Sequence, residues 1–267
     1  MPFTPSHAVV ALPFVRTPLV PAAIAVGAMT PDLPLFVRGT LFDYAVSHSF
    51  VWMPVTVMVA LVLLLVWRCV LRPAATELAP RWLAARLPRA WDAGAARGAH
   101  ETFARRGSTV VSTGGVALLV VSLALGAASH IAWDLFTHEG RWGTVILPVL
   151  DRPWGPFTGY KWLQHGSSAA GLGVLGVWGI LWLRRAPARR VARIVPDAVR
   201  LLWWASLPAA LLAAAIGGYV ALGPFSPEFT PAHLGYAVLP PACAAWGVVT
   251  VVLCLLVQRA RGRVASP

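Results

Sequence analysis

The chain has 267 residues, of which 58% are hydrophobic and only 12% are charged, and its mean hydropathy is +0.69. This composition excludes an ordinary soluble domain and is typical of a protein embedded in a lipid bilayer. The net charge of +12 does not indicate a nucleic-acid partner, because the arginines lie between long apolar runs and form no basic patch with interleaved aromatic residues.

The N-terminal apolar stretch, residues 8–29, differs from the others because prolines and Arg16 interrupt it. It is thereby divided into two pieces of about half the thickness of a membrane, so we expect a shallow helical hairpin. No basic segment precedes this stretch, and we therefore expect no cleaved signal peptide.

Five later stretches approach the roughly 20 apolar residues that a spanning helix needs. They cover residues 50–67, 108–133, 168–183, 201–222 and 234–257. In the third of these, glycines at 171, 173, 176 and 179 predict close approach of a neighbouring helix. The sequence thus predicts an all-α membrane bundle of about five transmembrane helices plus the hairpin. We expect residues 1–185, with a polar cytoplasmic insertion at 72–107, to form one domain, and residues 186–267 a two-helix segment.

The basic residues predict the orientation of these spans. All but five of the 22 lysines and arginines lie between the first two spans, between the third and fourth, or in the C-terminal tail. The exceptions are Arg16, Arg38, Arg141, Arg152 and Lys161. Because basic segments are retained on the cytoplasmic side, we expect a cytoplasmic C-terminus.

Most residues that can bind a metal fall on the predicted outer face: His7, Asp32, His48, His130, Asp134, His138 and His165. Imidazole and carboxylate groups without a nearby thiol are typical of zinc sites. His130 and Asp134 are four residues apart, so they share one face of a helix. A plain hydrogen-bonded pair remains open for these two residues, and a turn role remains open for Asp32, which lies between Pro31 and Pro34.

Several motifs resemble an uncharacterised bacterial membrane family, domain of unknown function 4184, over residues 1 to about 185. They are Met1-Pro2-Phe3-Thr4-Pro5-Ser6-His7, Thr30-Pro31-Asp32, Ser47-His48, Ser129-His130, Trp133-Asp134, His138 and Gln164-His165-Gly166. That family is similar to predicted membrane-bound metal-dependent hydrolases. More distantly, the order of histidines and aspartates is similar to that in the zinc sites of bacterial phospholipase C and the S1/P1 nucleases.

The phospholipase resemblance implies a site of two or three zinc ions. Asp32, His48, His130 and Asp134 would hold the first, Asp134 would bridge to a second held by His7, and His138 with His165 would hold a third. The phospholipase pattern has a glutamate four residues after its last histidine, where this chain has Ala169, so Glu139 or Glu228 would have to replace it. In those enzymes the N-terminal amine is a further ligand.

The pattern favours a metal-dependent hydrolase, specifically a phosphoesterase that acts on lipid or another membrane-associated substrate. Asp32 would orient or deprotonate the attacking water, while Lys161, Arg141 and Arg152 would neutralise a phosphate. These three cations are equally explained as charges that extend to the membrane interface. A non-enzymatic metal-binding or ion-transport protein is the main alternative, although the apolar middle of each span provides no polar conduction path. A purely structural relative also remains open.

Overall fold

The computed structural model describes residues 4–105, 107–108 and 110–265, which form two compact units. The first unit comprises residues up to 33, 42–66 and 99–185, and the second comprises 34–41, 67–98 and 186–267. Residue 185, where the sequence predicted a domain boundary, is one of the points at which the chain passes between units. Residues 67–98, which contain most of the polar insertion at 72–107, belong to the same unit as the C-terminal helices.

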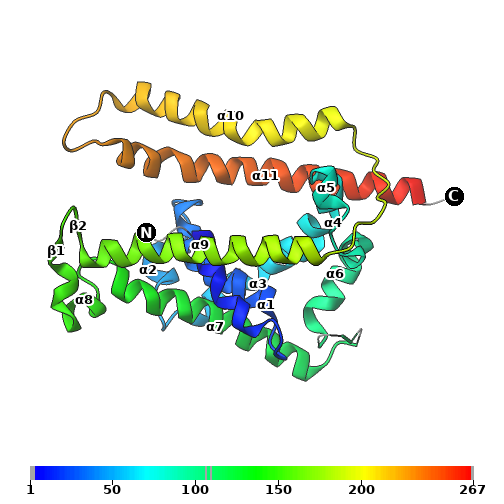
Figure 1. Cartoon of the computed structure of the whole chain (residues 1–267), viewed down its shortest axis with the longest axis horizontal. Coiled ribbons are helices and arrows are strands. Elements are labelled where there is room, and N and C mark those ends of the chain that lie inside the picture. The colour runs from blue at the N-terminus through cyan, green and yellow to red at the C-terminus, as the bar shows by residue number, and fades with distance from the viewer. Residues whose placement is uncertain (1–3, 106, 109, 266–267) are drawn as a thin grey trace. The chain divides into compact units, whose positions relative to one another are not determined.

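The first unit holds most of the N-terminal elements and two of the long helices (Figure 1). Its elements are η1 (Thr4–Phe14), α1 (Pro21–Met29), most of η2 (Thr30–Leu35), α2 (Tyr44–Ser47), α3 (Met53–Leu65), about half of α6 (Gly94–Phe103), α7 (Thr113–Thr137), α8 (Trp142–Ile146), η5 (Pro148–Asp151), β1 (Pro153–Trp154), β2 (Phe157–Thr158) and α9 (Gly159–Arg185). The two short strands pair antiparallel, with Trp154 opposite Phe157.

The second unit is built around an antiparallel pair of long helices, α10 and α11 (Figure 1). Its elements are nearly all of the π-helix η3 (Val66–Leu71), α4 (Arg72–Leu78), α5 (Arg81–Ala84), η4 (Arg89–Ala93), α10 (Asp197–Leu222) and α11 (Pro231–Ala265). Buried Glu77 joins its parts, because the carboxylate accepts hydrogen bonds from the Ile194 and Val195 amides and from Arg261.

Five helices of the described chain are long and apolar enough to cross a membrane. The first is the continuous helix Met53–Leu78, which consists of α3, η3 and α4. The others are Thr113–Thr137, Gly159–Arg185, Asp197–Leu222 and Pro231–Arg263. The number agrees with the sequence prediction, but nearly every helix extends beyond its apolar stretch because helical hydrogen bonding continues after the hydropathy has fallen. The third helix begins at Gly159 rather than near residue 168, so His165 lies inside it and not before it.

The N-terminal segment packs against α7. Here η1 adopts 3-10 geometry with Pro13 inside it, and α1 follows and contacts both η1 and α7. Whether this segment enters a membrane as a hairpin stays a prediction.

Glycines allow the backbones of α1 and α7 to touch. A Cβ at Gly126 would overlap the carbonyl oxygen of Ile24, and one at Gly27 would overlap that of Leu123. Ser122 adds a polar contact, since its hydroxyl accepts a 2.9 Å hydrogen bond from the amide of Val20 at the start of α1. The two helices are therefore held in a single register.

The expectation of close approach along the α9 glycines is largely wrong. A Cβ at Gly173, Gly176 or Gly179 would meet no described atom within 4 Å, whereas one at Gly171 would lie 2.9 Å from the Ser6 carbonyl oxygen. The close helix contact lies between α1 and α7 because those two helices cross in the core of the first unit.

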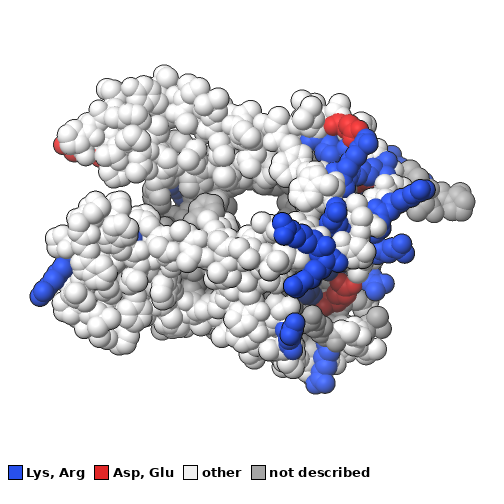
Figure 2. All heavy atoms as spheres, viewed as in Figure 1, with Lys and Arg blue, Asp and Glu red and all other residues white. Residues whose placement is uncertain are grey.

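Basic side chains of the second unit gather over α5 and residues 186–196, while the surfaces of α10 and α11 are mostly uncharged (Figure 2). Large apolar side chains on these helices are more than half exposed: Leu201, Leu202, Leu212, Ile216, Val220, Val248, Val249 and Val252. An exposed apolar surface bounded by arginines is the distribution that a lipid bilayer stabilises.

Candidate metal centre

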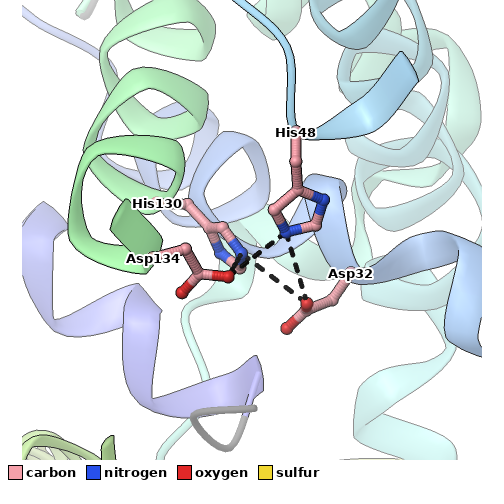
Figure 3. A group of neighbouring side chains, drawn as sticks. All are labelled: Asp32, His48, His130 and Asp134. Carbon is pink, nitrogen blue, oxygen red and sulfur yellow. Dashed lines mark ion pairs between the residues drawn. The ribbon is translucent and has the colours of Figure 1, made fainter. Parts of the chain in front are cut away.

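Four side chains of the first unit converge in its interior: Asp32 in η2, His48 just after α2, and His130 and Asp134 in α7 (Figure 3). One ligand atom from each lies within 4.8 Å of the others. The side chains of Asp32 and His130 are completely buried, and those of His48 and Asp134 are 4% and 6% exposed. Two aspartates and two histidines from separate segments thus share one buried position.

The spacing of these atoms suits a single cation. His48 Nε2 lies 3.3 Å from Asp134 Oδ2 and 4.0 Å from Asp32 Oδ1, and His130 Nε2 lies 3.5 Å and 3.6 Å from the same two oxygens. A tetrahedral ion with bonds of about 2.1 Å separates its ligand atoms by about 3.4 Å. Three of the four distances are close to this value, and the distance between His48 and Asp32, 4.0 Å, is longer.

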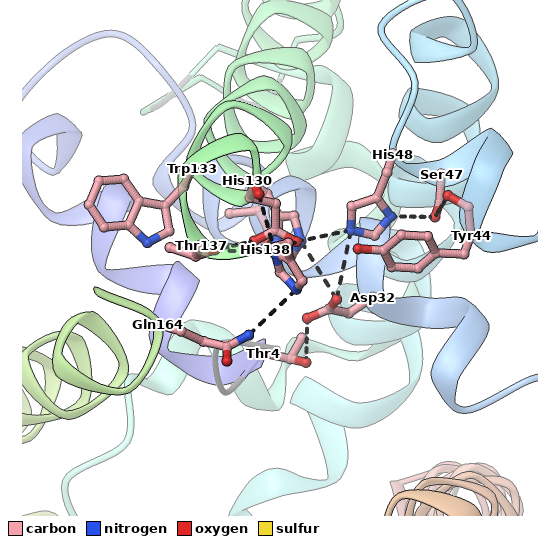
Figure 4. Close-up of polar contacts among 12 residues, drawn as sticks. Thr4, Asp32, Tyr44, Ser47, His48, His130, Trp133, Thr137, His138 and Gln164 are labelled. Carbon is pink, nitrogen blue, oxygen red and sulfur yellow. Dashed lines mark hydrogen bonds and ion pairs between the residues drawn. The ribbon is translucent and has the colours of Figure 1, made fainter. Parts of the chain in front are cut away.

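Each carboxylate has one oxygen held by an outer hydroxyl group, and Figure 4 shows the contact of Thr4 with Asp32. Thr4 Oγ1 donates a 2.6 Å hydrogen bond to Asp32 Oδ2, and Thr137 Oγ1 donates a longer one of 3.4 Å to Asp134 Oδ1. The remaining oxygens, Asp32 Oδ1 and Asp134 Oδ2, are those that face the histidines. The outer bonds therefore orient each carboxylate toward the centre.

The imidazoles are oriented in the same way. His130 Nδ1 lies 2.7 Å from the Ala28 carbonyl oxygen, and because a carbonyl only accepts, Nδ1 carries the proton. Ser47 Oγ lies 3.0 Å from His48 Nδ1 and also donates to the Tyr44 carbonyl oxygen, so it accepts from His48. With Nδ1 as the outer donor, a neutral ring of either histidine directs the lone pair of Nε2 inward, as metal-binding histidines with fixed tautomers do.

The inward atoms have no hydrogen-bond partner among the described residues. Asp32 Oδ1, His48 Nε2, His130 Nε2 and Asp134 Oδ2 are all buried and face one another, at nitrogen–oxygen distances that form an ion pair only when an imidazole is protonated. Leaving such groups unpaired costs about 1 to 3 kcal/mol each, and more when they are charged. Two adjacent carboxylates also repel each other in a buried site. A divalent cation would satisfy all four atoms and balance both negative charges, so the residues fit a metal ion.

His7 and His138 adjoin this group. The His7 ring stacks on His130 with centroids 4.0 Å apart, and its Nε2 is also buried without a hydrogen-bond partner among the described residues. Burial, together with the neighbouring His130, lowers the pKa of His7 to about 4, so the ring is neutral at physiological pH. His138 Nδ1 lies 3.6 Å from Asp134 Oδ2. Both rings are therefore next to the four-residue group.

The remaining predicted ligands lie elsewhere. His165 is exposed, with its ring 5.5 Å from that of Phe157. The preceding residue, Gln164, is the one that reaches the site, with its Nε2 3.5 Å from His138 Nε2. Of the two proposed substitutes for a missing glutamate, Glu139 accepts a hydrogen bond from Tyr160, and Glu228 accepts one from Ser226 in the second unit. The N-terminal amine belongs to Met1, outside the described residues.

Among the three predicted phosphate-binding cations, only Arg141 is connected to the site by described contacts. Its guanidinium carbon lies 5.6 Å from the Tyr44 ring centroid, and Tyr44 stacks on His48 at 3.7 Å. Lys161 and Arg152 are exposed near the β1–β2 hairpin. Burial raises the pKa of Tyr44 above its ordinary value, so its phenol remains a proton donor beside His48.

No role was predicted from the sequence for the outer partners of the candidate ligands, namely Thr4, Ala28, Tyr44, Ser47, Thr137 and Gln164, although Thr4, Ser47 and Gln164 lie within the motifs that carry the family resemblance. A local signal was present for two of them, because Ser47 and Thr137 directly precede His48 and His138 and contact those rings. The contacts of Thr4 and Ala28 bridge 28 and 102 residues and have no local signal.

A family model described as "Domain of unknown function (DUF4184)" matches residues 1–259. The match extends well beyond residue 185, where the motif resemblance ended, and includes α10 and most of α11. No curated protein and no solved structure matches the chain.

Proposed function

The chain belongs to the DUF4184 family, and we propose that it is a membrane-bound metal-dependent hydrolase that cleaves phosphate esters of lipid or another membrane-associated substrate. The proposal rests on one structural observation. Four buried ligand atoms face one another without hydrogen-bond partners in the described chain, while the other polar atom of each side chain is held by an outer group. Such preorganisation is characteristic of a metal centre.

We propose zinc as the ion, because two imidazoles and two carboxylates form a ligand set that it favours. Held by Asp32, His48, His130 and Asp134, the ion would polarise a phosphoryl group and lower the pKa of a bound water. His7 and His138 flank the same site and are proposed ligands of a second ion.

Two side chains of the protein would act on the water and on the phosphate of the substrate. Asp32 is buried, and Thr4 fixes its Oδ2, so its Oδ1 would either bind the ion or, in place of that role, orient or deprotonate a water. Arg141, next to Tyr44, would neutralise the charge of a phosphate that enters beside His48.

The membrane location is proposed from the five apolar helices and their exposed apolar side chains. The arginine distribution supports a cytoplasmic C-terminus and a metal centre on the outer face of a bacterial inner membrane. A substrate at the membrane surface would then reach the site from the lipid side.

Metal analysis is the decisive experiment. Protein purified in a mild detergent without chelator should contain at least one equivalent of zinc and hydrolyse bis-p-nitrophenyl phosphate, and chelator should remove both properties. Metal-free wild-type protein with an unchanged melting temperature in chelator would overturn the proposal. Stoichiometric metal without hydrolysis of any phosphodiester or phospholipid would instead favour the non-enzymatic alternative, a metal-binding or transport protein.

A further inference from the structure

The second unit contains a partly open cavity of about 490 Å³ that shares no residue with the metal centre. Its charged lining consists of Arg81, Arg189, Arg193, Arg200 and Asp197. Its other walls come from Ala85 and the segment 191–196. Four cations therefore face a single carboxylate within one cavity.

Two of these arginines are fixed in place by the fold. Arg200 is only 7% exposed, and it donates to the carbonyl oxygens of Glu77 and Val195 at 2.7 Å and 3.0 Å. Arg189 donates to Asp92 at 2.6 Å and to the Leu87 carbonyl oxygen at 3.1 Å. These two side chains are already ordered at the cavity wall, so little side-chain entropy would be lost when a ligand binds to them.

One nitrogen of the Arg193 guanidinium, the buried Nη1, has no hydrogen-bond partner among the described residues. Burial and the charge of Arg200 lower the pKa of Arg193. The carboxylate of Asp197 is already engaged by Arg81, at 2.7 Å, and by Arg200. Asp197 and Asp92 offset part of the charge of the four arginines, and in the described chain Arg193 is left with no ion pair to either of these carboxylates.

The start of α10 adds to the positive electrostatic potential in the cavity. This 26-residue helix begins at Asp197, and its N-cap residue, Pro196, supplies no side-chain hydrogen bond. Both residues line the cavity. The unpaired amides and the dipole of a long helix favour an anion at this end.

We propose that this cavity binds a phosphate group. Several guanidinium groups beside a helix N-terminus match the charge and the multiple acceptor oxygens of phosphate. The group belongs either to the headgroup of an anionic lipid or to a small soluble phosphate compound. The arginine-rich segments around the cavity are those expected at the cytoplasmic leaflet, where anionic lipid headgroups lie.

The test compares Arg193→Gln with Arg190→Gln in the full chain. Both variants remove one positive charge from the same segment, but Arg190 is exposed and does not line the cavity. Thermal unfolding is measured in neutral detergent with inorganic phosphate, against chloride at equal ionic strength. It is measured again in nanodiscs of phosphatidylcholine with and without phosphatidylglycerol.

We expect phosphate or phosphatidylglycerol to raise the melting temperature of wild type and of Arg190→Gln. Arg193→Gln should bind the effective anion about tenfold more weakly, the loss expected for one hydrogen bond to a charged group, while its stability without the anion is not reduced. A response to inorganic phosphate identifies a soluble ligand, and a response confined to phosphatidylglycerol identifies a lipid headgroup.

Three results would overturn the proposal. Wild type could fail to respond in either medium. The two variants could respond equally, which would place phosphate binding elsewhere, including at the metal centre. Arg193→Gln could lose stability without anion and keep the full anion response, which would make Arg193 a structural residue.

Discussion

The Nδ1 atom of His130 lies 2.7 Å from the carbonyl oxygen of Ala28, and this contact joins α7 to the last turn of α1. It fixes which nitrogen of His130 faces Asp32 and Asp134. The chain segment that carries Asp32 follows α1 directly, so both ligands depend on how α1 packs on α7. Metal binding should therefore respond to substitutions in this contact that change no ligand.

Gly126→Ala should weaken metal binding through packing alone. Its Cβ would lie 2.7 Å from the Ala28 amide nitrogen and would overlap the Ile24 carbonyl oxygen, so α1 must move away. Overpacking of this kind costs about 1 to 3 kcal/mol. We expect a lower melting temperature and reduced zinc content by elemental analysis. Gly173→Ala is the matched control, because no described atom lies within 4 Å of its Cβ. Equal behaviour of the two variants would contradict the α1–α7 register.

Asp134→Asn should remove at least one equivalent of bound metal. The amide keeps the size of the side chain but loses the charge that faces both histidines. In excess chelator its melting temperature should match that of wild type, because the difference between them is bound metal. Asp151→Asn, at an exposed position, should retain full metal content. Full occupancy in Asp134→Asn would show that this carboxylate is not a ligand.

Thr4→Val should lower metal affinity without removing a ligand. The variant deletes the 2.6 Å hydrogen bond that orients Asp32, and loss of an outer partner typically costs about 10 to 100-fold in affinity. Competition with a chromogenic chelator measures the change. Thr17→Val also loses a local hydrogen bond, to the Phe14 carbonyl oxygen, but not one to a ligand, so its affinity should be unchanged. A wild-type affinity for Thr4→Val would indicate that Asp32 needs no orientation.

Arg141→Ala should reduce phosphodiesterase activity if a phosphate binds beside Tyr44 and His48. A charge-assisted hydrogen bond contributes about 1.5 to 3 kcal/mol, so kcat/KM should fall about tenfold or more with metal content unchanged. Arg152→Ala removes an exposed cation from the same predicted outer loop and should have little effect. If both variants lose activity equally, the loss comes from weaker long-range electrostatic attraction of the substrate and not from a contact between Arg141 and the phosphate.

Reporter fusions should show the orientation of the spans. Fusions at Ala95, at Ala188 and at the C-terminus should report cytoplasm, and one at Gly155 should report the outside, because all but five of the 22 basic residues lie on the first set of segments. A cytoplasmic signal at Gly155 would place the loop before α9 on the inner face and reverse the proposed orientation.

The sequence by itself indicated the five apolar helices and a set of candidate metal-binding residues. Hydropathy is a sum over neighbouring residues, so a span is visible without tertiary contacts. In so apolar a chain, histidines and aspartates near the ends of spans are scarce, so residue type and position indicated seven candidates, and only the resemblance to the phospholipase zinc site grouped the four that cluster.

Only the tertiary structure decided which neighbours complete the centre. Successive residues on a helix point about 100° apart, so once α9 begins at Gly159, Gln164 faces the site and His165 faces outward. Likewise, the hydrogen bonds of Thr4 to Asp32 and of Ala28 to His130 join residues that are distant in the chain. Their partners are set by the close contact of α1 with α7, which no local pattern in the sequence reveals.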